Sequence, residues 1–343
     1  MPLPTDEMIS VVMPVHNALP YLDQAIESIL GQSLSEFEFV ILDDASNDGS
    51  TERLREWAAQ DPRIKLVRSN RNLGVVDSSN RVVHEASGTI IARMDADDVA
   101  HPQRLERQAA VLRENPDVGL VGTLCDIIDA KGRMLRGPEV WRLARRSWLA
   151  PFPHGSITYR RELFDRIGGY RAACEYWEDQ DFYLRMARQG RIMVVRDPLY
   201  QVRHSPTSTR VASDQRRVEQ AVDLMYRSIG RLDATGSFED VLNAGPQADS
   251  RIDPRVFISL GSLALWSGKR PHLFRRLLSR GRLRANAPSA AALVWTAWAS
   301  LSPGTLRAFL KLLMQSRNRF VSDAAATDEP IAWDPPRAAL QRH

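Results

Sequence analysis

The stretch Ile91-Ala92-Arg93-Met94-Asp95-Ala96-Asp97-Asp98 carries an apolar run directly into three carboxylates. If residues 89–94 form a buried strand, the chain leaves the core at Asp95. The three acids then lie at the end of a sheet, where open α/β folds bind ligands. Carboxylates this close repel one another unless a cation shares them, and hard oxygen ligands suit Mg²⁺ or Mn²⁺. The alternative is a solvated acidic turn.

Strands and helices are predicted to alternate before this stretch. Apolar runs and helical spacing predict strands at residues 10–15, 37–42 and 64–67 and helices at residues 21–30, 51–59 and 75–86. Such alternation indicates βαβ crossovers, and therefore an α/β fold with a mostly parallel sheet. The polar loops at 15–18, 43–49 and 95–98 all follow strands, so we expect them to gather at the carboxyl edge of the sheet.

After the acidic stretch the pattern continues less regularly. It predicts a helix at 104–112, strands at 119–123 and 192–195, a strand-like start and a helical turn within 156–171, and a helix start at 178–187. Residues 127–148 lose clear periodicity, and residues 203–208 read as a polar loop.

The character of the chain changes after about Val211, where only helical patterns remain. We therefore expect three parts: an α/β domain at 1–210, a helical region at 211–321, and a tail at 322–343. Pro330, Pro335 and Pro336 predict that the tail is loosely ordered.

Composition sets broad limits on this protein of 343 residues. Lys and Arg number 46 against 42 Asp and Glu, a modest excess that does not indicate nucleic-acid binding. The two cysteines, Cys125 and Cys174, imply no disulfide framework and fit a reducing cytosol. Residues 1–8 do not resemble a signal peptide, and no stretch reaches the ~18 to 20 apolar residues of a membrane span.

Six motifs between residues 8 and 208 together resemble family 2 inverting glycosyltransferases of the GT-A (Rossmann-like) fold. They occur in the order found in that family. The motifs are residues 12–17, 42–50, 72–75 with Asn80 and 86–88, 95–98, 154–156 and 177–181. Each motif alone is weak, since Asp-x-Asp is common by chance, but six in order are specific.

The resemblance implies a nucleoside-diphosphate sugar donor, UDP-linked, with Mn²⁺ or Mg²⁺ as cofactor. Asp97 would contact the metal, Asp95 the ribose or a metal-bound water, and Asp44 the uracil ring, while Asp43 holds its loop. Asp98 is either a partner that orients the other acids or a helix N-cap. The remaining donor-side positions are Pro14, His16 and Asn72, which line the nucleotide pocket, and Arg203, which would reach the diphosphate.

Three donor-side residues keep an open alternative. His204 is either a metal ligand, since imidazole suits Mn²⁺, or a surface histidine. Arg93 either offsets the charge of the acids or reaches the donor. The loop at 43–49 would otherwise be a plain turn rich in Asp, Asn and Gly.

On the acceptor side the resemblance makes Asp179 the general base. Glu178 and Asp181 lie beside it, and carboxylates so close would raise one another's proton affinity. The alternative is an acidic helix start favoured by the helix dipole. His154 would shape the acceptor pocket, and Trp177 would stack on a sugar ring unless it packs in the core.

Two other functions compete with glycosyl transfer. A sugar-1-phosphate nucleotidyltransferase would want a glycine-rich loop with a basic residue after the first strand. Here that loop, residues 14–18, holds neither Gly nor Lys. An inactive nucleotide- or carbohydrate-binding module is disfavoured because Asp97 and Asp179 are both present.

The C-terminal region holds a block of basic residues followed by an apolar stretch with Trp295 and Trp298. The basic residues are Lys269, Arg270, Arg275, Arg276, Arg280, Arg282 and Arg284. Basic amphipathic helices with tryptophan are typical of peripheral membrane contact. The alternatives are an ordinary helical domain and, less favoured, RNA binding. We therefore expect a cytoplasmic enzyme, peripheral at the membrane, that transfers sugar to a carbohydrate or lipid-linked acceptor in bacterial surface-polysaccharide synthesis, with no nucleic-acid partner.

Overall fold

The structure is a computed structural model that describes residues 8–137, 150, 152–172, 178–204 and 330–332. Its described strands form one ten-stranded sheet, with the order β10-β9-β6-β8-β4-β1-β2-β3 and with β5 and β7 added to β9 and β6. The predicted α/β class with a mixed, mostly parallel sheet and flanking helices is confirmed for these residues.

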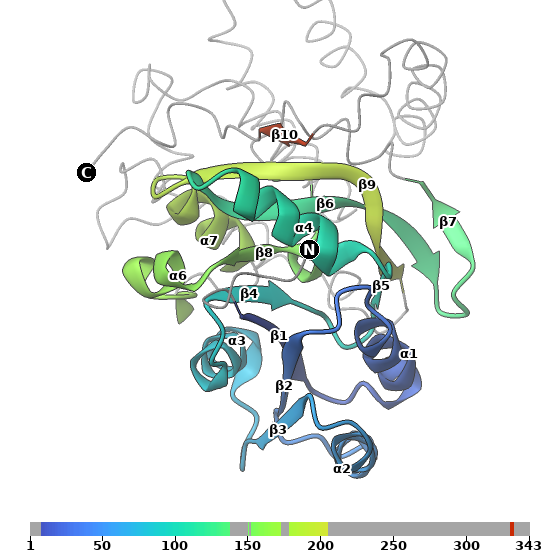
Figure 1. Cartoon of the computed structure of the whole chain (residues 1–343). Helices are drawn as coiled ribbons and strands as arrows, with labels where there is room; N and C mark the ends of the chain where they lie inside the picture. The colour runs from blue at the N-terminus through green and yellow to red at the C-terminus, as the bar shows by residue number, and fades with distance from the viewer. Residues whose placement is uncertain (1–7, 138–149, 151, 173–177, 205–329, 333–343) are drawn as a thin grey trace, which may run out of the picture. The chain divides into compact units, whose positions relative to one another are not determined.

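The first half of the sheet is parallel and carries the predicted alternation. Its elements are β1 (Ile9–Val15), α1 (Leu19–Leu30), β2 (Phe37–Asp43), α2 (Ser50–Gln60), β3 (Ile64–Arg68), α3 (Gly74–Glu85) and β4 (Ile90–Arg93). Strand β1 pairs in parallel with both β2 and β4, and it is apolar along most of its length because neighbouring strands and helices bury it. Helices α1 and α2 lie on one side of these strands and α3 on the other (Figure 1).

Helix α1 shows how the sequence sets an element. Pro20 lies in its first turn, where the missing N–H costs nothing, and Gly31 follows its last residue. Its buried face consists of Leu22, Ala25, Ile26 and Ile29, at helical spacing, and this face joins the hydrophobic core.

The second half of the sheet is mixed. Its elements are β5 (Val99–Ala100), α4 (Arg104–Glu114), β6 (Val118–Asp129), β7 (Met134–Arg136), η2 (His154–Ser156), β8 (Thr158–Arg160), α6 (Arg161–Ile167), α7 (Glu178–Met186), β9 (Arg191–His204) and β10 (Ile331–Ala332). Strand β8 runs antiparallel between β4 and β6, whereas β6 and β9 form a long parallel pair. Figure 1 shows β6, β8 and β9, green to yellow, beside the blue parallel half.

Several predicted boundaries were wrong in this half. Strand β9 extends to His204, so Arg203 and His204 belong to a strand and not to a polar loop, because they pair with the end of β6. Strand β6 likewise continues to Asp129, into the region that lacks clear periodicity. Ile331 and Ala332, predicted within the loosely ordered tail, pair with β9 as β10.

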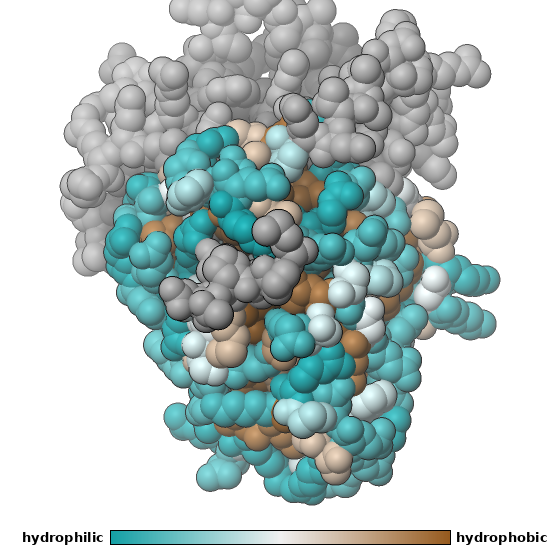
Figure 2. Space-filling view, in the orientation of Figure 1, coloured by the Kyte–Doolittle hydropathy of each residue, from teal (hydrophilic) through white to brown (hydrophobic). Residues whose placement is uncertain are grey.

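The helical region predicted at 211–321 lies outside the described residues, and its boundaries stay a prediction. Among the described helices, none combines the length and the apolar character that crossing a bilayer requires. In Figure 2, the described residues present a mostly hydrophilic face, with smaller apolar areas among the hydrophilic ones.

Candidate functional site

The loops after β1 and β2 are joined at the carboxyl edge of the sheet. The backbone N–H of Asp44 donates to the carbonyl of Val15 at 2.7 Å, and Asn47 N–H donates to Asn17 Oδ1 at 2.9 Å. Asn17 and Ala45 both adopt positive φ, 53° and 55°, which is uncommon for residues other than glycine. Backbone in this region collects at ligand sites, so the strain supports a binding role for these loops.

His16, Asp44 and Asn72 meet at this edge, as the sequence predicts. His16 Nδ1 lies 2.7 Å from the carbonyl oxygen of Asp44, and its Nε2 lies 3.1 Å from Asn72 Nδ2. A carbonyl can only accept and an amide nitrogen can only donate, so these partners assign a neutral imidazole with its proton on Nδ1. His16 and Asn72 are exposed, which leaves them open to a ligand.

The two carboxylates at the end of β2 differ in their partners. Asp43 accepts from Ser46 N at 3.0 Å and from the Thr51 hydroxyl at 2.6 Å, so it holds the loop, as predicted. Asp44 is also buried, and its oxygens accept from the backbone N–H groups of Leu73 and Gly74 at 2.8 and 3.2 Å. Asp44 thereby ties the start of α3 to the loop after β2. Pro14 lies at the half-buried end of β1 beside it.

The acidic motif follows β4, as predicted, and its three carboxylates are not equivalent. Asp95 is paired with the buried guanidinium of Arg93, which confirms that Arg93 offsets the charge of the acids. Asp97 is half-buried, whereas Asp98 is 4% exposed. Asp98 precedes β5 and not a helix, so the helix N-cap alternative for this residue is wrong.

Asp98 is held in a polar cage from strand β9. Its Oδ1 accepts from the backbone N–H of Arg203 at 2.7 Å, and the Tyr200 hydroxyl donates to its carboxyl group. Burial, followed by the charges of Asp97 and Asp95, raises the pKa of Asp98 well above its usual range. Tyr200 also accepts from the backbone N–H of Asp95 at 3.2 Å, so one hydroxyl spans the motif.

Arg203 is buried at the end of β9, against the acidic motif. Its guanidinium donates to the carbonyl of Asp97 at 2.7 Å, to the carbonyl of Asp129 at 3.1 Å and to Gln24 Oε1 at 2.5 Å. Its predicted contact with the diphosphate stays a prediction. His204 follows it in the strand and is exposed. Successive residues of a strand face opposite sides of the sheet, and the role of His204 as a metal ligand stays a prediction.

The carboxylates do not form a closed metal cage. Among the described residues, no three His, Cys, Asp or Glu side chains are arranged to hold a metal ion. Mg²⁺-type sites in nucleotide enzymes use one or two carboxylates, with waters and substrate phosphates completing the shell. The partly exposed carboxylates of Asp95 and Asp97 fit that open type of site.

The predicted acceptor-side acids begin helix α7. Asp179 is half-buried, and its Oδ1 accepts from Gln180 N at 2.7 Å. Asp181 is buried in an ion pair of 2.6 Å with Arg185, one turn later, which commits it to structure. Glu178 is buried. Asp179 is therefore the acid of this group that retains exposure.

His154 packs beside α7, and its acceptor-side role stays a prediction. Its Nε2 lies 2.8 Å from the Tyr170 hydroxyl, and its ring meets Tyr170 and Tyr183 edge-on. Burial raises the pKa of the Tyr170 hydroxyl, Arg93 opposes this, and Glu178 and Asp179 add to it. The rings around His154 therefore lie within electrostatic reach of Asp179. Trp177 lies outside the described residues.

Sequence reasoning missed two buried polar residues of α4, Arg104 and Gln108, that support the motif. Arg104 is fully buried, donates to the carbonyl of Arg93 at 2.5 Å and lies over the Tyr200 ring at 5.1 Å. Burial lowers its pKa to about 10. Gln108 bonds Arg104, Thr158 and two carbonyls. The signal in the sequence was a pair of polar residues on the inner face of a helix, four positions apart.

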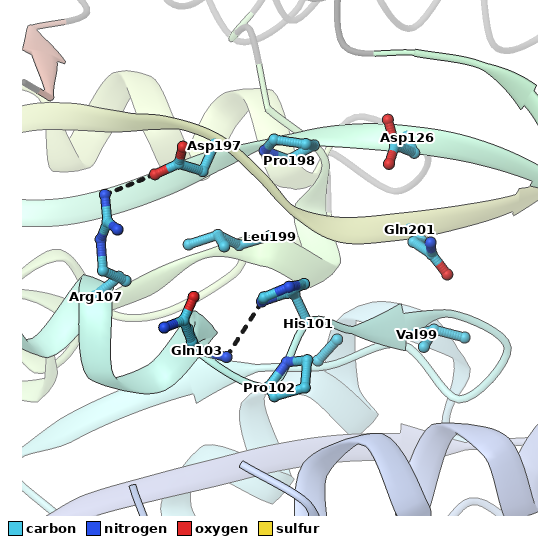
Figure 3. A pocket seen from close by; sticks show the side chains of 11 residues that line it. Val99, His101, Pro102, Gln103, Arg107, Asp126, Asp197, Pro198, Leu199 and Gln201 are labelled. Carbon is cyan, nitrogen blue, oxygen red and sulfur yellow. Dashed lines mark hydrogen bonds and ion pairs between the residues drawn. The ribbon is translucent and has the colours of Figure 1, made fainter. Parts of the chain in front are cut away.

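A groove of about 470 Å³ lies beside the acidic motif, beyond β5 (Figure 3). Its polar lining includes His101, Gln103, Asp126 and Gln201, and Arg107 pairs with Asp197 at 2.6 Å across one end. Figure 3 shows these side chains around the groove. It contains none of the predicted site residues, so the candidate site consists of the loops at the strand ends.

Comparisons with known proteins find glycosyltransferases among the relatives of this chain. A family model described as glycosyl transferase family 2 matches residues 10–178. The Bacillus subtilis (strain 168) protein named "Putative glycosyltransferase EpsE" is 34% identical over 233 residues, 65% of this chain and 82% of that protein. The Escherichia coli O-antigen biosynthesis glycosyltransferase WbnJ is 30% identical over 192 residues, 53% of this chain and 73% of that protein.

Two solved structures share the fold at low sequence identity. The mannosyltransferase PcManGT from Pyrobaculum calidifontis, in complex with GDP-Man and Mn²⁺, has a TM-score of 0.56 and 21% identity, covering 95% of this chain and 90% of that one. Residues 1–349 of S. aureus TarS, in complex with UDP-GlcNAc, have a TM-score of 0.55 and 17% identity, covering 81% and 89%. At this level of sequence identity, the two structures show a shared fold only.

Proposed function

The chain belongs to glycosyl transferase family 2, a family of glycosyltransferases with nucleotide-sugar donors, and on that premise we propose an inverting, metal-assisted transfer from a uridine-diphosphate sugar to an acceptor hydroxyl. One observation carries the proposal. The cluster of His16, Asp44 and Asn72 and the acidic motif after β4 both follow neighbouring parallel strands, so they share one edge of the sheet. A nucleotide with its diphosphate spans such an edge.

On the donor side, the base would lie at the loops after β1 and β2. Each carboxylate oxygen has two lone pairs, so Asp44 keeps acceptor capacity for a base N–H beside its bonds to Leu73 and Gly74. Pro14 and His16 flank this position. A divalent cation held by Asp97, with Asp95 beside it, would neutralise the charge of the departing diphosphate.

On the acceptor side, Asp179 would accept the proton of the attacking hydroxyl. The hydroxyl oxygen forms a bond to the anomeric carbon as the bond from that carbon to the diphosphate breaks, and the proton passes to the Asp179 carboxylate. Attack opposite the leaving group inverts the anomeric centre. His154 and the rings beside it would form a wall of the acceptor pocket, with Glu178 and Trp177 as further acceptor-side residues.

The biological setting rests on the relatives. WbnJ is named for O-antigen biosynthesis, which supports a carbohydrate or lipid-linked acceptor in bacterial surface-polysaccharide synthesis for this chain. The named donors of the two solved structures are GDP-Man and UDP-GlcNAc, so uridine and guanosine nucleotides are the two donors to compare.

Calorimetry of the full chain with UDP or GDP, each with and without Mn²⁺, tests this proposal. We expect UDP to bind in a manganese-dependent way, and we expect Asp97→Ala to abolish the manganese dependence because it removes the metal ligand. Asp165→Ala, which removes an exposed carboxylate on α6, is the matched control and should bind as the wild type does. Unchanged manganese-dependent affinity in Asp97→Ala would remove Asp97 from the metal site, and preference for GDP would replace the uridine assignment.

A further inference from the structure

Arg203 has the contacts of a residue that shapes the acidic motif. Its side chain is buried, with the residue 3% exposed, although it is the second-last residue of β9 and precedes the exposed His204. Each of its three guanidinium nitrogens donates to a protein oxygen: Nε to the carbonyl of Asp97, Nη1 to the carbonyl of Asp129, and Nη2 to the side chain of Gln24. These acceptors come from three separate segments of the chain.

The main chain of Arg203 adds a fourth contact to the same motif. Its N–H donates to Asp98 Oδ1 at 2.7 Å, while its Nε holds the carbonyl of Asp97 at 2.7 Å. Two consecutive residues of the motif are therefore fixed by one residue of β9. Since the carbonyl of Asp97 is held from this side, the position of the Asp97 main chain, from which its carboxylate extends, depends on Arg203.

The guanidinium of Arg203 also stacks on an aromatic ring of α1. Its carbon lies 4.7 Å from the centre of the Tyr21 ring, and both Tyr21 and Gln24 belong to α1. A planar cation on an aromatic ring with hydrogen bonds along its edges is a pre-organised fork. Lysine has the same charge but a single ammonium group, so it cannot reach three segments at once.

We propose that Arg203 is a positioning residue that sets the metal affinity of Asp97 by tying the acidic motif to α1 and to the end of β6, without itself contacting the diphosphate. The inference rests on the proposed donor site. It assigns Gln24, an exposed glutamine of α1, to the same support.

The test compares Arg203→Lys with the wild type in two titrations: UDP without metal, and Mn²⁺ into the UDP-loaded protein, both by calorimetry. Partners that orient a metal ligand typically change metal affinity by about 10- to 100-fold. We expect Arg203→Lys to weaken Mn²⁺ binding by at least about tenfold and to leave metal-free UDP binding unchanged, because the positive charge stays and the diphosphate has lost no contact.

Gln24→Ala is a second variant, and it replaces an exposed residue instead of a buried one. Gln24 is exposed, so its removal should not unfold the protein, and we expect a weaker Mn²⁺ effect in the same direction. Gln60→Ala, at an exposed glutamine that ends α2, is the matched control and should bind Mn²⁺ as the wild type does. Hydrogen exchange of the peptide covering residues 94–100 should be faster in Arg203→Lys and Gln24→Ala, with or without ligand.

The outcomes separate this inference from the proposed function. A loss of metal-free UDP affinity in Arg203→Lys would show that Arg203 contacts the diphosphate and would overturn the positioning role. Unchanged Mn²⁺ affinity and unchanged exchange in both variants would overturn it as well. If the wild type binds no UDP, the proposal of a uridine-diphosphate donor is wrong. Faster hydrogen exchange in the two variants would then still show that Arg203 holds the acidic motif in place.

Discussion

Asp179 is the residue on which the chemistry of transfer depends in this proposal. Its carboxylate retains exposure at the start of α7, while its neighbour Asp181 is neutralised by Arg185. Asparagine keeps the shape of the side chain and can still accept from Gln180 N–H, but it has no basicity. We expect Asp179→Asn to bind UDP and Mn²⁺ like the wild type and to transfer sugar at least about 100-fold more slowly, as a lost general base implies.

Steady-state release of UDP and calorimetry of UDP binding, measured on the same preparations, check this expectation. Asp165→Asn makes the same chemical change at an exposed position and should alter neither quantity. Near wild-type transfer together with failed UDP binding would place Asp179 in the donor site instead.

For single residues, the sequence predicted those contacts whose partners are close in the chain or lie in loops that follow successive strands. Asp43 holding its loop and the meeting of His16 with Asn72 are of this kind. Tyr200 could not be predicted, because its role depends on β9 lying beside the acidic motif, and nothing local to Tyr200 encodes that pairing. A buried polar partner is specified by tertiary contacts, not by periodicity.

Among the elements, Glu38 of β2 joins three neighbouring segments. Its carboxylate accepts from the Ser10 hydroxyl on β1, from the backbone and hydroxyl of Ser87, and from Gly88 N–H ahead of β4. Burial alone would raise the pKa of Glu38, but these hydrogen bonds outweigh it and hold the pKa below 4.5. A lowered pKa means that the ionised form stabilises the fold above pH 4.5, and that this stability is lost as the pH falls through the folded-state pKa.

We therefore expect Glu38→Gln to lower the free energy of unfolding by about 1 to 2 kcal/mol at pH 7, the usual range for hydrogen bonds to a charged group at a partly buried site. The difference from the wild type should shrink as the pH falls below 4.5, the ordinary pKa of a glutamate, and should be lost once the pH is below the lowered folded-state pKa of Glu38. Urea unfolding between pH 7 and pH 4 measures both effects. Glu36→Gln, at an exposed position nearby, is the control, and a difference that grows on acidification would contradict the linkage.

Local patterns predicted the elements of the parallel half well, because each strand there is a continuous apolar run and each helix has one apolar stripe. They failed where the pairing partner decides the strand. Strand β5 has two residues, and the second half of β9 carries Asp197, Pro198, Arg203 and His204, so only the start of β9, at 192–195, reads as a strand. The rest of β9 is a strand because it pairs with β6, and β5 is one because it pairs with β9.

Considering the molecule as a whole, residues 331–332, far along the chain, return to the main sheet. Ile331 and Ala332 pair with Val194 and Met193 on the outer side of β9, so β10 covers part of that strand. Truncation near Val211 would remove β10 and leave the polar backbone of this part of β9 without its partner. Point substitutions in the full chain therefore test the C-terminal region more cleanly than deletion does.

The basic block at 269–284 lies outside the described residues, and its role stays a prediction from the sequence. A lipid-linked acceptor would lie at a membrane surface, and each basic residue near anionic lipid contributes at most about 1 kcal/mol, which salt screens. In a flotation experiment, the full chain should therefore rise with anionic vesicles at low salt and stay in the bottom fraction at high salt. Combined Arg275→Gln, Arg276→Gln and Arg280→Gln should weaken binding by up to about 100-fold.

The control for this prediction makes the same change in net charge on the described surface. Arg55, Arg133 and Arg166 have side chains 57%, 75% and 54% exposed, and their combined change to glutamine should leave vesicle binding close to that of the wild type. Equal loss in both triple variants would mean that total charge, and not the basic block, drives binding. If the wild type does not float even at low salt, the C-terminal residues do not dock on lipid, and the acceptor must reach the enzyme from solution.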